Sequence, residues 1–115
     1  MEGPAQRFVN AMSRLGLSPR LEAGLVIFRI VSAAGAHAGK PLDIGVSLEE
    51  LTGWPQVPPH WIHLPADIRF ATTNVAPSSK PGWNKHSRNS AGWGDAPPEV
   101  CWTSHIHAVL SEAIL

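Results

Sequence analysis

Tyrosine is missing from this sequence of 115 residues, cysteine occurs once, and charge is scarce. Charged residues make up 16% of the chain, and nine Lys and Arg balance nine Asp and Glu. This balance excludes the broad basic surface of a typical nucleic-acid-binding domain, so we expect no nucleic-acid partner. Because a lone cysteine cannot form an internal disulfide, the sequence favours a cytoplasmic protein.

Long apolar runs and nucleotide-binding motifs are also missing. The longest uncharged apolar run covers residues 23–28, whereas a membrane-spanning helix needs about 20 apolar residues. The first residues, Met-Glu-Gly-Pro, do not resemble a secretion signal. The patterns GxGxxG, GxxxxGKS/T and GxSxG do not occur, which argues against dinucleotide, P-loop and serine-hydrolase sites. We therefore expect no membrane partner and no cofactor.

Tryptophan, glycine and proline are plentiful instead. The chain contains five Trp, ten Gly and eleven Pro, and 43% of its residues are hydrophobic. Gly and Pro interrupt regular structure, whereas each buried Trp removes a large apolar area from water. The length suits one domain with a modest core. We predict a single domain over residues 1–115 that carries long ordered loops.

Hydrophobic periodicity predicts regular elements in the first 70 residues. Apolar residues recur at helical spacing over residues 5–16, which predicts an amphipathic helix. Residues 24–31 are rich in β-branched side chains and predict a buried strand. Residues 42–48 alternate between apolar and small or polar residues, as in a second strand. Residues 61–64 predict a third strand, and residues 68–70 a short fourth one.

The chain changes character after these strands. Residues 71–99 contain 14 Pro, Gly, Ser and Asn, and a loop of this length in a compact domain is usually functional or disordered. Thr103 or Ser104 can cap a closing helix. Its predicted apolar face consists of Ile106, Val109, Leu110, Ala113 and Ile114. The order of helix, strands, loop and helix predicts an α+β domain.

Cys101 is the first candidate for chemistry, and two interpretations are open. It follows the polar loop by two residues and precedes the predicted helix by two or three. Free backbone N–H groups at a helix start stabilise a thiolate, which favours a reactive cysteine. Alternatively, Cys101 is a small buried hydrophobe, the more common role of a lone cysteine.

The histidines form two short motifs. His60 and His63 are three residues apart, so on one strand they point to opposite faces. His105 and His107 are two residues apart, which places them about 200° apart around a helix. Neither spacing converges on one ion, and we expect no metal site.

The segment Trp54-Pro55-Gln56-Val57-Pro58-Pro59 lies between two predicted strands. Together with the order of elements around it, this segment resembles the ubiquitin-conjugating (UBC) superfamily. Members of that family have an N-terminal helix and an antiparallel four-stranded meander with a Tyr-Pro-x-x-Pro-Pro turn. A long active-site loop follows, then the catalytic cysteine and further helices. The resemblance covers nearly the whole chain and gives Trp54, Pro55, Pro58 and Pro59 a structural role.

The resemblance implies a cysteine thioester mechanism. Cys101 would hold the C-terminus of a protein cargo as a thioester and transfer it to an amine. The family's His-Pro-Asn motif is missing here, so Asn89 is the first candidate to stabilise the oxyanion, with backbone N–H groups after Cys101 as the second. His86 would orient or deprotonate a group, and Lys80 and Lys85 are candidate acceptors.

Only 14 residues follow Cys101, enough for one short C-terminal helix. Such trimming resembles the stand-alone bacterial conjugating enzymes of CBASS antiphage systems. That resemblance implies a cGAS-like nucleotidyltransferase as the cargo, in bacterial antiviral defence. The alternative is a non-catalytic UBC-like adaptor in which Cys101 is buried.

Overall fold

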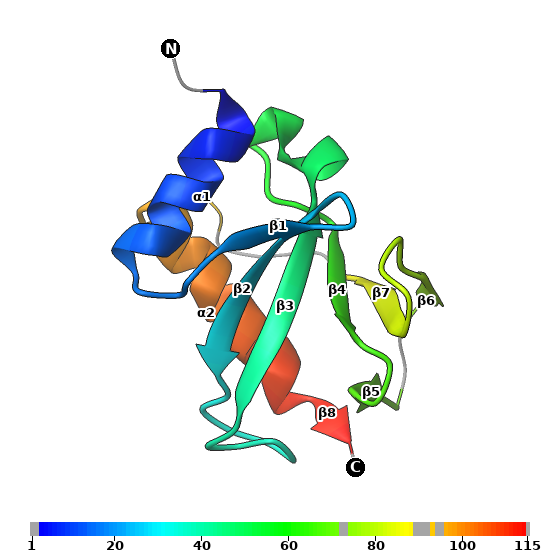
Figure 1. The fold of residues 1–115 in the computed structure, drawn as a ribbon. Coiled ribbons are helices and arrows are strands. Elements are labelled where there is room, and N and C mark those ends of the chain that lie inside the picture. The colour runs from blue at the N-terminus through cyan, green and yellow to red at the C-terminus, as the bar shows by residue number, and fades with distance from the viewer. Residues whose placement is uncertain (1–2, 72–73, 89–92, 94–95, 115) are drawn as a thin grey trace.

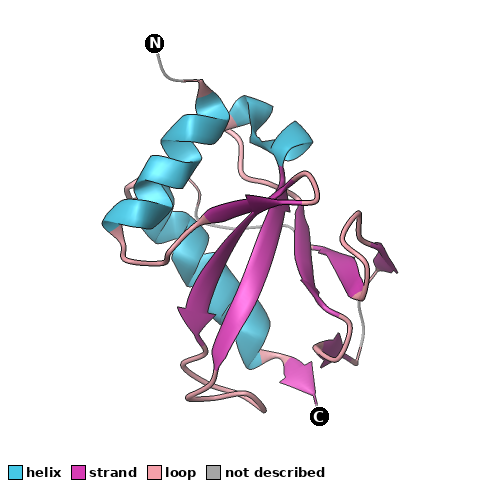
Figure 2. Cartoon of the chain, viewed as in Figure 1, coloured by secondary structure: helices cyan, strands magenta, loops and turns pink. Residues whose placement is uncertain are grey.

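The computed structural model describes residues 3–71, 74–88, 93 and 96–114. Helix α1 covers Pro4–Arg14, the 3₁₀ helix η1 Leu48–Gly53 and helix α2 Pro98–Ser111. The strands are β1 (Arg20–Glu22), β2 (Leu25–Val31), β3 (Pro41–Ser47), β4 (Trp61–Pro65), β5 (Arg69–Phe70), β6 (Val75–Pro77), β7 (Trp83–Ser87) and β8 (Ala113–Ile114). The fold is α+β, as predicted, with an N-terminal helix, an antiparallel sheet and a C-terminal helix (Figures 1 and 2).

The main sheet has six strands in the order β1-β2-β3-β4-β7-β6, and every neighbouring pair is antiparallel. The helix at 5–16 and the strands at 24–31, 42–48 and 61–64 are confirmed, each with shifts of one or two residues at its ends. The short strand predicted within residues 68–70 exists as β5, but it does not extend the meander, because it pairs with β8 in a separate two-stranded sheet. Strand β7 occupies its place beside β4 instead.

The prediction of one long loop over residues 71–99 is wrong. Strands β6 and β7 lie inside that range and extend the main sheet. Strand β7 turns Asn84 and His86 to the core side, opposite Leu64 and Ile62, and His86 is buried there. Because a polar residue stands where an apolar one is usual, β7 shows no apolar alternation along the sequence.

Helix α2 begins earlier than predicted. Its first residue is Pro98, preceded by Pro97 in an extended conformation. Proline suits the first helical position because its missing N–H would have no partner there. Thr103 lies inside the helix, where its hydroxyl donates to the Glu99 carbonyl at 2.9 Å. The helix ends at Ser111, so the last two residues of the predicted apolar face belong to β8.

One apolar core fills the space between the sheet and the two helices. Helix α2 crosses one face of the sheet, and α1 lies near its N-terminal part (Figure 1). Phe8 of α1 contacts Phe28 and Trp54 edge to face, with ring centroids 5.8 and 4.9 Å apart. Trp102 of α2 is fully buried beside Phe8. The helix-covered face of the sheet is therefore built almost entirely from hydrophobic packing.

Candidate functional site

Cys101 lies in the first turn of α2, not before the helix as predicted. Its side chain is half-buried, not buried as the alternative interpretation expects, and its thiol donates to the Ala96 carbonyl at 3.4 Å. The backbone N–H groups of Val100 and Cys101 both donate to the Pro97 carbonyl at 3.0 Å. The groups at the start of this helical turn are thus the carbonyl oxygens of Ala96 and Pro97, and not the free N–H groups that were expected.

This helix start offers few donors to a negative charge. Pro97 and Pro98 have no N–H group, and those of Val100 and Cys101 are bonded within the turn. The N–H groups after Cys101 belong to the helical ladder, where each donates to a carbonyl four residues earlier. They are therefore committed to the helix instead of being directed at an oxyanion. Asn89, the first candidate oxyanion donor, lies outside the described residues.

His86 lies in β7 on the helix-covered face and is 3% exposed. Its ring packs edge to face on Phe70, with centroids 5.0 Å apart. Burial lowers the pKa of His86, and the nearby Arg88 guanidinium lowers it further. Phe70 pairs with Ala113, just beyond the C-terminal end of α2. His86 thus lies toward the opposite end of α2 from Cys101.

The two candidate acceptor lysines lie on the other face of the sheet. Lys85 is opposite His63 in the register of β4 and β7, one residue out of phase with His86. Because side chains alternate along a strand, Lys85 points away from the face that α2 covers. Lys80 lies in the turn between β6 and β7, where its Nζ contacts a carboxylate oxygen of Glu22 at 2.6 Å. The structure therefore does not gather Cys101, His86 and the lysines into one site.

The proline-rich turn joins α1 to the segment that leads into α2. Trp54 is 3% exposed and forms a cis peptide bond with Pro55. The Trp93 ring contacts Trp54 at a centroid distance of 5.5 Å, and its Nε1 donates to the Pro55 carbonyl at 3.1 Å. Pro59 is buried and Pro58 half-buried. These contacts support the predicted structural role of the turn.

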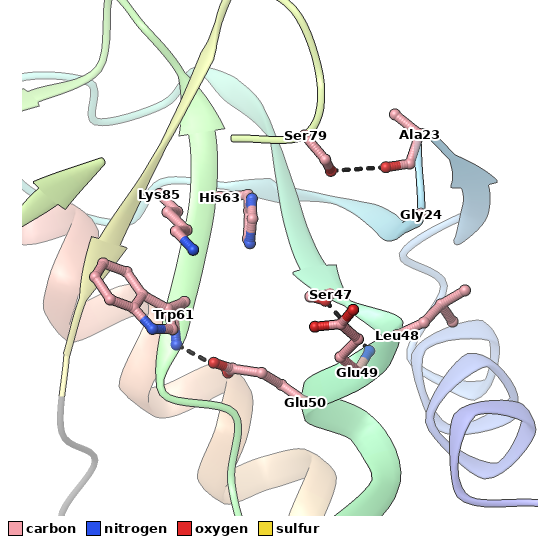
Figure 3. Close-up of a pocket in the computed structure, with 10 residues that line it drawn as sticks. All are labelled: Ala23, Gly24, Ser47, Leu48, Glu49, Glu50, Trp61, His63, Ser79 and Lys85. Carbon is pink, nitrogen blue, oxygen red and sulfur yellow. Dashed lines mark hydrogen bonds between the residues drawn. The ribbon is translucent and has the colours of Figure 1, made fainter. Parts of the chain in front are cut away.

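A pocket of about 560 Å³ lies on the sheet face away from α2 (Figure 3). Trp61 and His63 of β4 and Lys85 of β7 form one wall, and Glu49 and Glu50 of η1 form another. Sequence analysis missed this site because its assembly depends on the pairing of β4 with β7. The available signal was the alternation along β4, which sends Trp61 and His63 to the same face.

The hydrogen bonds of this pocket fix two of its side chains. One Glu50 carboxylate oxygen accepts the backbone N–H groups of His60 and Trp61, at 2.6 and 3.0 Å. His63 Nδ1 lies 2.7 Å from Ser78 Oγ. Burial lowers the pKa of His63 to about 4, with contributions from the Lys85 and His86 charges. The His63 ring is therefore neutral near pH 7.

Among residues 3–71, 74–88, 93 and 96–114, no three His, Cys, Asp or Glu side chains are grouped to hold a metal ion. No helix in these ranges is long and apolar enough to cross a membrane. Comparisons with family models, curated proteins and solved structures gave no match to this chain.

Proposed function

We propose that this chain is a UBC-like domain that acts by binding a protein partner. The order of elements supports this proposal: an N-terminal helix, an antiparallel meander, a proline-rich turn before β4 and a C-terminal helix across the sheet. The turn packs between α1 and Trp93, just ahead of α2. The partner in this proposal is a protein with an exposed C-terminus, such as a cGAS-like nucleotidyltransferase in bacterial antiviral defence.

Within this proposal, a non-catalytic adaptor is the function that the geometry supports best. The observation that carries it is the separation of the residues to which the resemblance gives catalytic roles. Cys101 lies in the first turn of α2, His86 lies near the other end of that helix, and Lys85 is on the opposite sheet face. General acid–base and transfer chemistry requires such groups within hydrogen-bond reach of one another.

A cysteine acyl carrier is the second candidate. It is favoured by the partial exposure of Cys101 and by the place of its helical turn, since Pro98 and Glu99 line a cavity together with Trp54. In this mechanism the thiolate attacks the activated C-terminal carbonyl of the cargo, forms the thioester and expels the activating group. An amine then displaces the thiolate, which leaves an amide on the acceptor and regenerates Cys101. Cytoplasmic location remains part of both proposals.

Two measurements after co-expression with the genomic neighbours distinguish the two functions: whether a partner protein is retained, and the mass of the protein itself. The adaptor predicts a partner retained equally by the wild type and Cys101→Ala, with no thiol-sensitive mass addition. The carrier predicts an addition that a reducing agent removes and that Cys101→Ala abolishes. Cys101→Ser should replace it with a stable oxyester or with no adduct. A reductant-resistant adduct mapped to Lys80 or Lys85 and dependent on Cys101 would establish transfer. If no partner is retained and no adduct forms, both functions are wrong.

A further inference from the structure

The pocket lies on the sheet face away from α2, which we call the open face. At one end of this pocket the Lys85 side chain provides a positive charge. The Lys85 ammonium lies 4.7 Å from the centre of the Trp61 ring, a contact that holds a cation over the negative face of an aromatic ring. The five ion pairs found among the described residues do not include Lys85. Figure 3 shows its Nζ pointing into the pocket. The ammonium is thus positioned but not neutralised.

His63 supplies a second donor beside this ammonium. Its side chain is 4% exposed, and Ser78 Oγ, which contacts Nδ1, also accepts the Lys80 backbone N–H at 3.2 Å. In the tautomer that suits this pocket, the Ser78 hydroxyl donates its proton to Nδ1. The neutral ring then carries its own proton on Nε2. Figure 3 shows one His63 ring nitrogen on the Lys85 side of the pocket.

The opposite wall limits the charge that the pocket can accept. Glu50 is committed to two backbone N–H groups, whereas Glu49 lines the pocket without an ion pair among the described residues. One ammonium and one neutral imidazole suit a single negative charge. A dianion such as phosphate would be repelled by the Glu49 carboxylate about twice as strongly as a monoanion, without a second cation to balance its extra charge.

We propose that this pocket binds the carboxylate of a small organic acid or of a peptide C-terminus, with Lys85 Nζ and His63 Nε2 as the two donors. The volume of about 560 Å³ lies within the range of small-molecule sites. The Trp61 ring provides an apolar surface for the carbon atoms next to the carboxylate. This inference goes beyond the proposed function and does not depend on it, because it rests only on the residues that line the pocket and not on a UBC-like role.

The test is a titration of the full chain with N-acetylglycine, followed by the NMR signals of the His63 ring and the Trp61 indole. N-acetylglycinamide has nearly the same shape without the charge and is the matched ligand control. We expect saturable shifts of both signals with the acid and at least about tenfold weaker binding of the amide, since a charge-assisted hydrogen bond is lost. Equal binding of acid and amide would overturn the proposal.

Two variants locate the binding on the protein. Lys85→Gln keeps a polar side chain that is one atom shorter and removes its charge, and we expect about tenfold or greater loss of affinity for N-acetylglycine. Lys40→Gln, in the loop between β2 and β3, removes the same charge elsewhere and should bind as the wild type does. Unchanged affinity in Lys85→Gln, or equal losses in both folded variants, would place the carboxylate outside this pocket.

A longer ligand distinguishes the two sources of the carboxylate. N-acetyl-triglycine presents the same terminal group on a peptide backbone. Tighter binding of this peptide than of N-acetylglycine would identify a peptide C-terminus as the occupant. Equal affinity of the two acids would identify a small organic acid. Absence of saturable shifts with both acids would show that the pocket binds no carboxylate, and the proposal would be wrong.

Discussion

The two faces of the main sheet differ in what their side chains do. The face that α2 covers is packed with apolar residues, and Phe8, Trp54 and Trp102 on it are nearly inaccessible to water. The other face carries the pocket, where Trp61 and Lys85 are both half-buried and the Lys85 side chain points into the pocket. Strand β4 supplies both faces, because its side chains alternate between them.

Within a single strand, the residues that stabilise the core therefore alternate with the residues that line the pocket. Ile62 and Leu64 of β4 belong to the apolar core, while Trp61 and His63 line the pocket. The same alternation divides β7, where His86 is turned to the core and Lys85 to the pocket. Residues that are neighbours in the sequence, such as Lys85 and His86, therefore cannot be assumed to share a site.

The largest expected effect comes from breaking the helix-covered face. Trp54→Ala removes an indole that packs on Phe8 and Trp93 and is 3% exposed. We expect the free energy of unfolding in urea to fall by about 3–5 kcal/mol, because the transfer free energy is lost and a cavity remains.

Trp61→Ala is the matched control on the open face. It deletes the same side chain from a half-buried position beside Lys85, so we expect a loss of no more than about 2 kcal/mol. If the two substitutions lower the unfolding free energy equally, the two faces do not differ in their contribution to stability.

A second substitution tests the end of the β2–β3 hairpin, where it meets α2. Gly35 has φ +86°, and a Cβ atom there would lie 2.7 Å from the Ser111 carbonyl oxygen. Gly39 has φ +81° and open space around the corresponding position. Gly35→Ala therefore combines backbone strain with a clash, whereas Gly39→Ala has the strain alone.

We expect Gly35→Ala to lower the unfolding free energy by about 2–4 kcal/mol and Gly39→Ala by about 1 kcal/mol. Thermal or urea unfolding of both variants measures the difference. Equal losses would mean that the hairpin does not contact the end of α2.

The sequence predicted the elements whose apolar residues follow a clear period. Phe8 and Met12 marked the face of α1, and Ile44 and Val46 marked the buried side of β3. Strand β7 was not predicted, because the polar residue His86 occupies a core-facing position where an apolar residue is usual. The start of α2 was misplaced because Thr103 is a good capping residue, although two prolines earlier in the chain had already begun the helix.

The candidate sites were harder to predict than the fold. Burial of Trp54 follows from its size and its place in the turn, and it is confirmed. The pocket requires the register that places Lys85 opposite His63, and no local pattern encodes a pairing across 22 positions of sequence. The surroundings of Cys101 depended on where α2 begins, so an error of a few residues changed the expected donors into carbonyl groups.

The pH dependence of stability tests the open face. The pKa of His63 is about 4 in the folded protein, against an ordinary value of 6.5. Between these two values the unfolded chain binds a proton that the folded chain does not, so the unfolding free energy falls as the pH drops from about 6.5 to about 4. His86 and His105 change it in the same direction, because burial lowers their pKa values as well.

Solvent in the pocket screens the charge, and we assign about 1–2 kcal/mol of this loss to His63. Urea unfolding at about pH 7 and about pH 4.5 measures it, and His63→Asn should show a correspondingly smaller loss. Carboxylates titrate equally in both proteins and cancel in the comparison. An identical pH dependence in the wild type and His63→Asn would contradict the burial of a neutral His63.

Lys85→Gln should have the smallest effect on stability, but it should change the titration of His63 in the pocket. The Lys85 side chain is half-buried on the sheet face away from the core, where its charge contacts the Trp61 ring and forms no ion pair among the described residues. The unfolding free energy near pH 7 should therefore change by no more than about 0.5 kcal/mol. Burial is the main cause of the low pKa of His63 and the Lys85 charge is the next. Removing that charge should therefore raise the pKa of His63 above 4, which an NMR titration of the ring measures directly. Lys40→Gln should leave the His63 titration unchanged. If Lys85→Gln also leaves it unchanged, the ammonium and the imidazole do not share the pocket, and the cationic end on which carboxylate binding depends does not exist.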